Sequence, residues 1–183
     1  MATSKTGSFW LTEAVTSTVA TNGIYTGTLD LGAYVDVGDQ QAIAIEQVDF
    51  IWQRLADATD TYDGNLAAAT TSNGSLDAQL SDNNPGGLIL RADDQNLIAS
   101  ATLNIDDANS IVSRGTDMFP DTFGKLDESR MVVNDQLYFV ADISPTLAAG
   151  MSLVCVARIK ARIVKLSTKD WMAIAIQSTA ADN

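Results

Sequence analysis

Acidic and amide residues around a turn-forming glycine give the chain one candidate for metal chemistry. The segment contains Asp57, Asp60, Asp63, Gly64 and Asn65. Hard cations such as Ca²⁺ bind carboxylate and carbonyl oxygens, and glycine permits the sharp turn that brings such oxygens together. The acids recur at every third residue, whereas an EF-hand loop places its ligands at alternate positions and ends in Glu. The pattern therefore predicts at most a weak Ca²⁺ loop, with a solvated acidic loop as the alternative, and no other cofactor.

No residue type in the chain points to catalysis. The 183 residues include no His, which excludes the Ser-His-Asp triad and every mechanism that uses imidazole as a base. The single cysteine, Cys155, lies on the apolar phase of a strand pattern and is expected to be buried and inert. Asp93-Asp94 and Asp106-Asp107 are adjacent carboxylates that would point to opposite faces of a strand, so turns explain them better than a glycosidase site. We therefore expect no catalytic residue and no enzyme.

The charge is strongly negative but unevenly distributed. The chain has 23 acidic and 11 basic residues, a net charge of −12, so direct binding to nucleic acid phosphates is not expected. Arg158, Lys160 and Arg162 nevertheless alternate along one predicted strand and so share one face. Two alternatives remain for this basic stripe: ion pairs with neighbouring strands, or a docking surface for other copies of the chain or for an anionic membrane surface.

Aromatic residues follow a polar leader at the start of the chain. Residues 1–8 read as a flexible N-terminal arm, and Phe9 and Trp10 come directly after it. Terminal arms fray unless they dock, so this aromatic pair is a candidate anchor on a neighbouring subunit. The leader lacks the apolar core of a secretory signal, and no run approaches the length of a membrane span. We therefore expect a protein made in the cytoplasm.

Strand patterns dominate the elements that would position these residues. Residues 153–163 alternate strictly, and residues 131–143 are apolar on both faces, so the two segments together predict a hairpin with a long loop. Residues 41–55 begin with Ile43 and Ile45 on one phase and continue with Val48 and Trp52 on the other. Such a slip near residues 46–47 predicts a β-bulge.

The remaining segments complete an all-β prediction. Further strands are expected at residues 9–15, 24–31, 88–92 and 97–105, with residues 56–86 as a long loop excursion that holds at most one short strand at 76–80. Residues 106–113 could form a short helix. Ser167 and Asp170 resemble a capping box before residues 171–176, where a helix and a strand remain alternatives, and residues 177–183 are a C-terminal tail. The fold class is a single jelly roll or β-sandwich over residues 1–183, with about eight strands and at most two short helices.

This layout resembles a known family of viral proteins. The features that carry the resemblance are the leader before Ser8-Phe9-Trp10, the segment 29–37 leading into residues 43–52, the long loop, the strands at 131–143 and 151–166, and the Asp-rich composition. They are similar to those of the small single jelly-roll major capsid proteins of membrane-containing icosahedral viruses that infect halophilic archaea or thermophilic bacteria. The resemblance covers most of the chain and includes no diagnostic motif.

The resemblance implies a structural role in a virion. Members of that family build capsomers from upright barrels and have no catalytic residues, so the expected partners are copies of this chain, other capsid proteins and an internal membrane surface. The alternative is an acatalytic carbohydrate- or ligand-binding β-sandwich, with Trp10 or Tyr62 as a stacking platform and the Asp57–Asn65 loop for Ca²⁺. Clustering of exposed aromatic residues on one face would favour that alternative.

Overall fold

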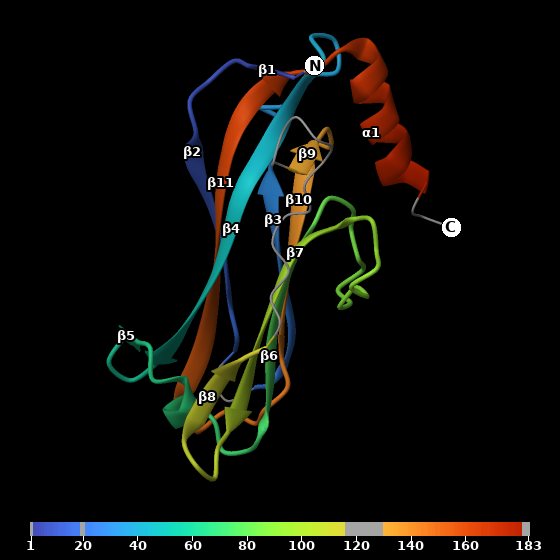
Figure 1. Cartoon of the computed structure of the whole chain (residues 1–183). Helices are drawn as coiled ribbons and strands as arrows, with labels where there is room; N and C mark the ends of the chain where they lie inside the picture. Colours follow the sequence, from blue (N-terminus) through green and yellow to red (C-terminus); the bar gives the residue numbers. More distant parts are fainter. Residues whose placement is uncertain (1, 19–20, 116–129, 181–183) are drawn as a thin grey trace.

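Two antiparallel sheets face each other across a common core (Figure 1). The computed structural model describes residues 2–18, 21–115 and 130–180. Sheet A contains β1 (Thr3–Ser4), β2 (Phe9–Thr16), β4 (Gln41–Ala56), β5 (Thr61–Asp63), β9 (Arg130–Val132) and β11 (Met151–Lys165). Sheet B contains β3 (Gly23–Asp30), β6 (Gly74–Ser81), β7 (Leu97–Asp106), β8 (Ile111–Arg114) and β10 (Gln136–Ile143). A 3₁₀ turn, η1 (Leu66–Ala69), and one helix, α1 (Thr168–Ala180), complete the described part.

The order of the strands is that of a jelly roll. In sheet A one run of neighbouring strands is β2-β11-β4-β9, and in sheet B the corresponding run is β3-β10-β6-β7. Taken in chain order, these eight strands pass from one sheet to the other at every step except from β6 to β7, in the pattern of two interleaved Greek keys. β1, β5 and β8 extend the edges. The predicted fold class, a sandwich of about eight strands with little helix, is confirmed.

A β-bulge sets the register of the two longest strands. β4 pairs with β11 from Gln41 to Ala56, and the register shifts where Lys160 is opposite Gln47 but Ala161 is opposite Ile45. Glu46 is the extra residue. Ile45 and Val48 consequently both point into the core, although an uninterrupted strand would place them on opposite faces. The bulge predicted near residues 46–47 is confirmed.

The core fills the space between the inner faces of the sheets. Phe50 of sheet A stacks on Phe139 of sheet B with ring centroids 5.9 Å apart. Trp52 and Cys155 lie in the same cluster, and burial raises the pKa of the Cys155 thiol well above its usual value. The thiol is therefore protonated and shielded, as the apolar phase of its strand predicted.

The predicted hairpin between residues 131–143 and 153–163 is wrong. Residues 131–143 form two strands, because the chain turns at Asn134 and Asp135 and passes from β9 in sheet A to β10 in sheet B. β10 pairs with β3 and β6, and β11 pairs with β2 and β4. The apolar residues on both faces suggested one central strand. Val140, on the outer face, is instead buried where the loop at residues 84–87 lies over it.

Three further expectations are corrected by strand pairing. Residues 56–86 are not an excursion, because they contain β6, which lies between β10 and β7 in the middle of sheet B and includes the short strand expected at 76–80. Residues 88–92 form no strand: both edges of β6 are already occupied, and Leu90 bonds the Gln79 side chain instead. Residues 106–113 form no helix, because β8 pairs back onto β7 after a turn.

Both ends of the described chain lie on sheet A. The described part of the expected arm, residues 2–8, is not free: β1 pairs with Val164 and Lys165 at the end of β11, and the Lys5 amide donates to the Ile163 carbonyl at 2.8 Å. Ser167 accepts a hydrogen bond from the Asp170 amide at 3.2 Å and donates to its carboxylate at 2.7 Å. This capping starts α1, so a helix and not a strand follows, and it includes the first residues of the expected C-terminal tail.

α1 packs on the outer face of sheet A through a second apolar cluster. Trp171 and Ile174 join a cluster of small and medium side chains from β4, from β9 and the residue after it, and from the end of β11 and the residue after it, namely Ala42, Ala44, Met131, Val133, Val164 and Leu166. The opposite side of the helix exposes Met172 and Ile176. No helix in the described residues has the length and apolar character needed to cross a membrane.

A buried ion pair ties the two sheets together near this end. Arg130, at the start of β9, lies 3.5 Å from the Asp82 carboxylate, which follows β6, and donates to the Gln95 carbonyl at 2.6 Å. Both side chains are almost completely buried. Burial raises the pKa of Asp82, and the positive charge of Arg130 offsets part of that rise. The pair is therefore needed to keep an ionised carboxylate at this position.

Replacing Arg130 with Met is expected to lower the free energy of unfolding by about 3–5 kcal/mol at pH 7, because it leaves a buried carboxylate without its cation. The pKa of Asp82 then rises further above its ordinary 3.8, and a raised pKa means that ionisation costs stability as the pH rises. The loss should therefore shrink as the pH falls toward about 4.5. Urea unfolding at both pH values measures this effect. The matched Asp82→Asn, Arg130→Met variant should lack the pH dependence, and equal losses at both pH values for the single variant would contradict the prediction.

The packing of α1 on sheet A can be tested with two isoleucines that lie on opposite sides of the helix. Ile174 is 7% exposed and Ile176 is 62% exposed. Ile174→Ala should weaken helix docking by about 2–4 kcal/mol and so accelerate proteolysis of the C-terminal residues, because it empties a buried site. Ile176→Ala should leave the cleavage rate of the isolated subunit near that of the wild type. Equal rates of proteolysis in the two variants would show that the docking of α1 does not depend on the Ile174 contact.

Candidate functional site

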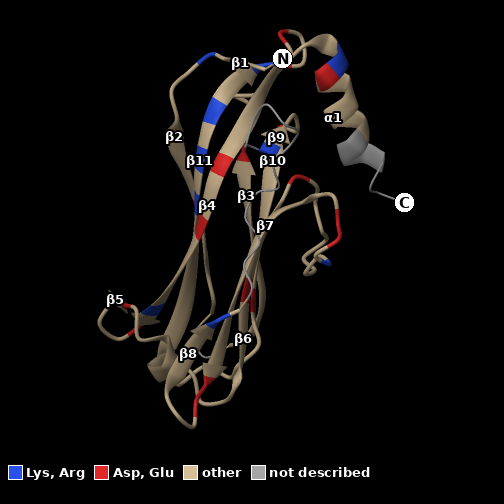
Figure 2. Ribbon diagram, in the orientation of Figure 1, with Lys and Arg blue, Asp and Glu red and all other residues tan. Residues whose placement is uncertain are grey.

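The outer face of sheet A brings together the residues that the sequence singled out. Leu153, Cys155, Ala157, Ile159 and Ala161 point into the core, so the intervening side chains of β11 point outward. The outward side chains include the basic stripe of Arg158, Lys160 and Arg162. Figure 2 shows the stripe as blue bands on β11 beside acidic residues of β4. β2 contributes Trp10 to the same face, opposite Lys160.

The bulge residue Glu46 holds two members of the stripe. Its carboxylate lies 3.7 Å from the Lys160 ammonium and 3.5 Å from the Arg162 guanidinium. It also accepts a hydrogen bond from Ser8 at 2.8 Å. Lys160 and Arg162 therefore have partners inside the subunit, as the alternative of cross-strand ion pairs anticipated. Sequence reasoning located the bulge but did not assign this role to its extra residue.

Arg158 differs from the rest of the stripe because its described contact is aromatic. Its guanidinium lies 4.6 Å from the centroid of the Trp10 ring. Asp49, directly opposite on β4, accepts a hydrogen bond from Gln47 at 2.8 Å and forms no ion pair with Arg158 in the described part of the chain. Stacking orients the guanidinium while leaving its N–H donors available in an exposed position.

Apolar side chains lie next to Arg158 on the same face, in the direction of the start of β11. Val156 of β11 is flanked by Ala14 of β2 and Ile51 of β4, and Ile51 is 38% exposed. Trp10 is 44% exposed. A flat sheet surface that combines an exposed Trp, an exposed Arg and aliphatic neighbours has the composition of the centre of a protein–protein interface.

Phe9 has a different role from the one the sequence suggested. As part of β2 it points toward the inner side and packs against Tyr34 in a tilted arrangement, with ring centroids 5.4 Å apart. The aromatic pair is therefore divided, with Phe9 fastening β2 to its own subunit and Trp10 on the outer surface. Adjacent residues of a strand point to opposite faces, which explains the division.

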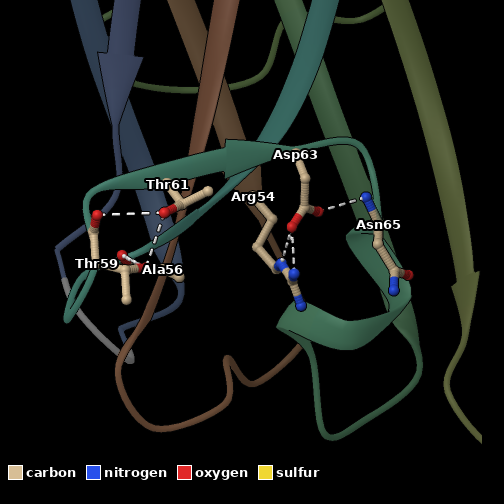
Figure 3. A network of polar contacts seen from close by, with 6 residues as sticks. All are labelled: Arg54, Ala56, Thr59, Thr61, Asp63 and Asn65. Atoms are coloured by element: carbon tan, nitrogen blue, oxygen red, sulfur yellow. Dashed lines mark hydrogen bonds and ion pairs between the residues drawn. The ribbon is translucent and has the colours of Figure 1, made fainter.

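The three candidate Ca²⁺ ligands do not converge. Figure 3 shows Asp63, on β5, turned toward Arg54 of β4, whose Nε lies 3.1 Å from Asp63 Oδ2 and whose Nη2 forms an ion pair with the same oxygen. The Arg54 guanidinium holds the pKa of Asp63 below its usual value. Asp57 accepts a hydrogen bond from Ser152 at 2.9 Å. Among the described residues, no three acidic or cysteine side chains are grouped as metal ligands.

The other paired acids stabilise turns. Asp93 forms an ion pair with Arg91 at 2.9 Å, and Asp94 accepts a hydrogen bond from the amide of Asn96. Asp106 accepts hydrogen bonds from Asn109. Their ordinary explanation as turn residues is confirmed.

One carboxylate pair had no sequence signal. Asp77 of β6 and Asp142 of β10 lie directly opposite each other on the outer face of sheet B. Burial and the negative charge of Asp77 raise the pKa of Asp142. The two residues are 65 positions apart in the chain, so only the pairing of β6 with β10 brings them together.

Comparisons with known proteins give limited information. No family model matches the chain, and no curated protein matches it. Among solved structures, a mutant of the unassembled Washington University polyomavirus VP1 pentamer is similar, with a TM-score of 0.40 and 9% identity, over 87% of this chain and 93% of that chain. The order of the strands, and not this likeness, defines the sandwich as a jelly roll.

Calcium binding by the Asp57–Asn65 segment is expected to be weak, because Arg54 already occupies the Asp63 carboxylate. Calorimetric titration of the protein with Ca²⁺ should give no micromolar binding. Arg54→Ala is the matched variant, because it frees the Asp63 carboxylate from its ion pair. Asp60→Ala instead removes one of the candidate ligands. Micromolar binding by the intact chain that Asp60→Ala abolishes would contradict this prediction and establish a Ca²⁺ loop.

Proposed function

We propose that this chain is a structural, acatalytic viral capsid protein that assembles with copies of itself into capsomers of an icosahedral shell. The observation that carries the proposal is the order of its strands, a complete eight-stranded jelly roll in two sheets. Jelly rolls occur in viral capsids, lectins and cupins, so the fold by itself leaves several roles open. The features of the outer face of sheet A support the capsid role among them.

The outer face of sheet A favours assembly. It presents Trp10 and Arg158 on a sheet face that α1 covers only at the end near Ala42 and Ala44. Trp and Arg are the residue types most often found to dominate binding energy at protein interfaces. Met172, on the side of α1 that faces away from sheet A, is a further exposed apolar side chain that assembly could bury.

The finer parts of the proposal rest on the sequence resemblance. They are a membrane-containing icosahedral virus, a location in the virion, other capsid proteins as additional partners and an internal membrane surface near the shell. The net charge of −12 agrees with a protein that does not bind nucleic acid directly.

The alternative of a carbohydrate- or ligand-binding module has less support. Trp10 and Tyr62, its proposed stacking residues, lie on β2 and β5, which are separated by β11 and β4. A polar hollow of about 330 Å³ lies instead on sheet B, between β3, β10 and the loop at residues 84–87. Neither aromatic residue lines it. The parts of a sugar-binding platform are therefore distributed over different faces.

Light scattering of the purified chain tests the proposal. We expect an oligomer at neutral pH, with rings or closed shells in electron micrographs, and an association that changes with NaCl between about 0.1 and 1 M because charged contacts are screened. Arg91→Ser removes an exposed cation of another surface and should leave assembly intact. A monomer under every salt condition would overturn the capsid proposal.

A further inference from the structure

The outer face of sheet B carries an electrostatic conflict that the described subunit does not resolve. Asp77 and Asp142 are opposite each other on neighbouring strands, and like charges in this arrangement are destabilising. Their sequence neighbours Leu76, Ala78, Ala141 and Ile143 point into the core, so both carboxylates point outward. Asp77 accepts hydrogen bonds from Ser75 at 2.7 Å and Thr102 at 2.6 Å. Within the described residues, neither carboxylate has a Lys or Arg in an ion pair.

The complementary group lies on the opposite side of the sandwich. Arg158 on the outer face of sheet A is stacked on Trp10 and, in the part of the chain that the structure describes, has no carboxylate partner. A guanidinium presents several N–H donors in a planar fork that matches carboxylate oxygens. Stacking on Trp10 also reduces the side-chain entropy that binding would cost.

Apolar residues lie beside both charged groups. On sheet B, Ile24 of β3 is opposite Asp142 and is 42% exposed. On sheet A, Ile51 and Val156 are paired with each other and lie on the same outer face as Arg158. Each surface therefore combines charge with aliphatic side chains, and the two charges are opposite. Complementary patches on different faces of one molecule produce a head-to-tail contact, which closes into a ring when the rotation between copies permits it.

We propose that Arg158 of one copy, stacked on Trp10, binds between Asp77 and Asp142 of the next copy, so that sheet A of each subunit packs on sheet B of its neighbour. This inference rests on the proposed function, because it names the contact through which copies assemble. Each guanidinium offsets part of the repulsion within a carboxylate pair that is unfavourable in the isolated subunit. The partner is a second copy of this chain.

The proposal predicts opposite effects on the subunit and on the assembly. Because burial and Asp77 raise the pKa of Asp142, ionisation of Asp142 costs the free subunit stability at neutral pH. Asp142→Asn should therefore raise the melting temperature of the dissociated protein while it weakens association. If Asp142 had a purely structural role, the same substitution would lower both the melting temperature and the strength of association.

A charge-reversal experiment tests the contact. Arg158→Asp and Asp142→Arg, made separately, should each weaken association at least about tenfold in sedimentation or light scattering, since each places like charges against each other. Combining them should recover part of the lost association, because the pair between positions 158 and 142 is reformed with its signs exchanged while Asp77 keeps its charge. Circular dichroism of each variant confirms that the subunit is folded, and Arg91→Asp, on an exposed loop, is the matched control.

The outcomes separate the two proposals. If the wild-type chain is monomeric under all salt conditions, both the capsid proposal and this contact are overturned. If it forms oligomers that Arg158→Asp leaves unchanged, or if the double variant is no better than the single variants, self-assembly stands and this contact is wrong.

Discussion

The register between β4 and β11 is the constraint on which the remaining structure depends. These strands form the centre of sheet A, and the bulge at Glu46 changes which residues of β4 point inward. Ile43 and Ile45 are buried on one side of the bulge, and Val48 and Trp52 on the other. Without the extra residue, one of these two sets would point to solvent. The burial of both apolar sets is therefore what fixes the register.

The same bulge determines the chemistry of the outer face. It turns Ala42 and Ala44 outward, where their small side chains allow α1 to pack closely, and it directs Glu46 toward Lys160 and Arg162. Arg158 lies beyond the reach of this carboxylate and stacks on Trp10. The outer face is thus divided into an end covered by the helix, a region neutralised within the subunit, and a region around Arg158 that can receive a partner.

Alternation of the chain between the two sheets explains the long-range contacts. β9 and β10 are separated by a short turn but belong to different sheets, and the buried pair of Arg130 and Asp82 fastens the sheets near that crossing. β6 and β10, far apart in sequence, become neighbours and bring Asp77 opposite Asp142. The surfaces available for assembly therefore follow from strand order more than from local sequence.

The sequence by itself determined features that depend on near neighbours along the chain. Alternation of side chains identified the strands around β2, β3, β4, β7 and β11, the phase slip at residues 46–47 identified the bulge, and Ser167 with Asp170 indicated a capping box, after which a helix and a strand remained alternatives. Only the tertiary structure decided which strands pair, because periodicity is a property of one strand and pairing depends on two. For this reason residues 131–143 gave a false hairpin, the short strand expected at 76–80 was placed in a loop excursion and not in the middle of a sheet, and the Asp77 and Asp142 pair had no signal. The basic stripe was visible in the sequence, but the difference between Arg158 and its neighbours depends on Glu46 and Trp10, which other strands bring to it.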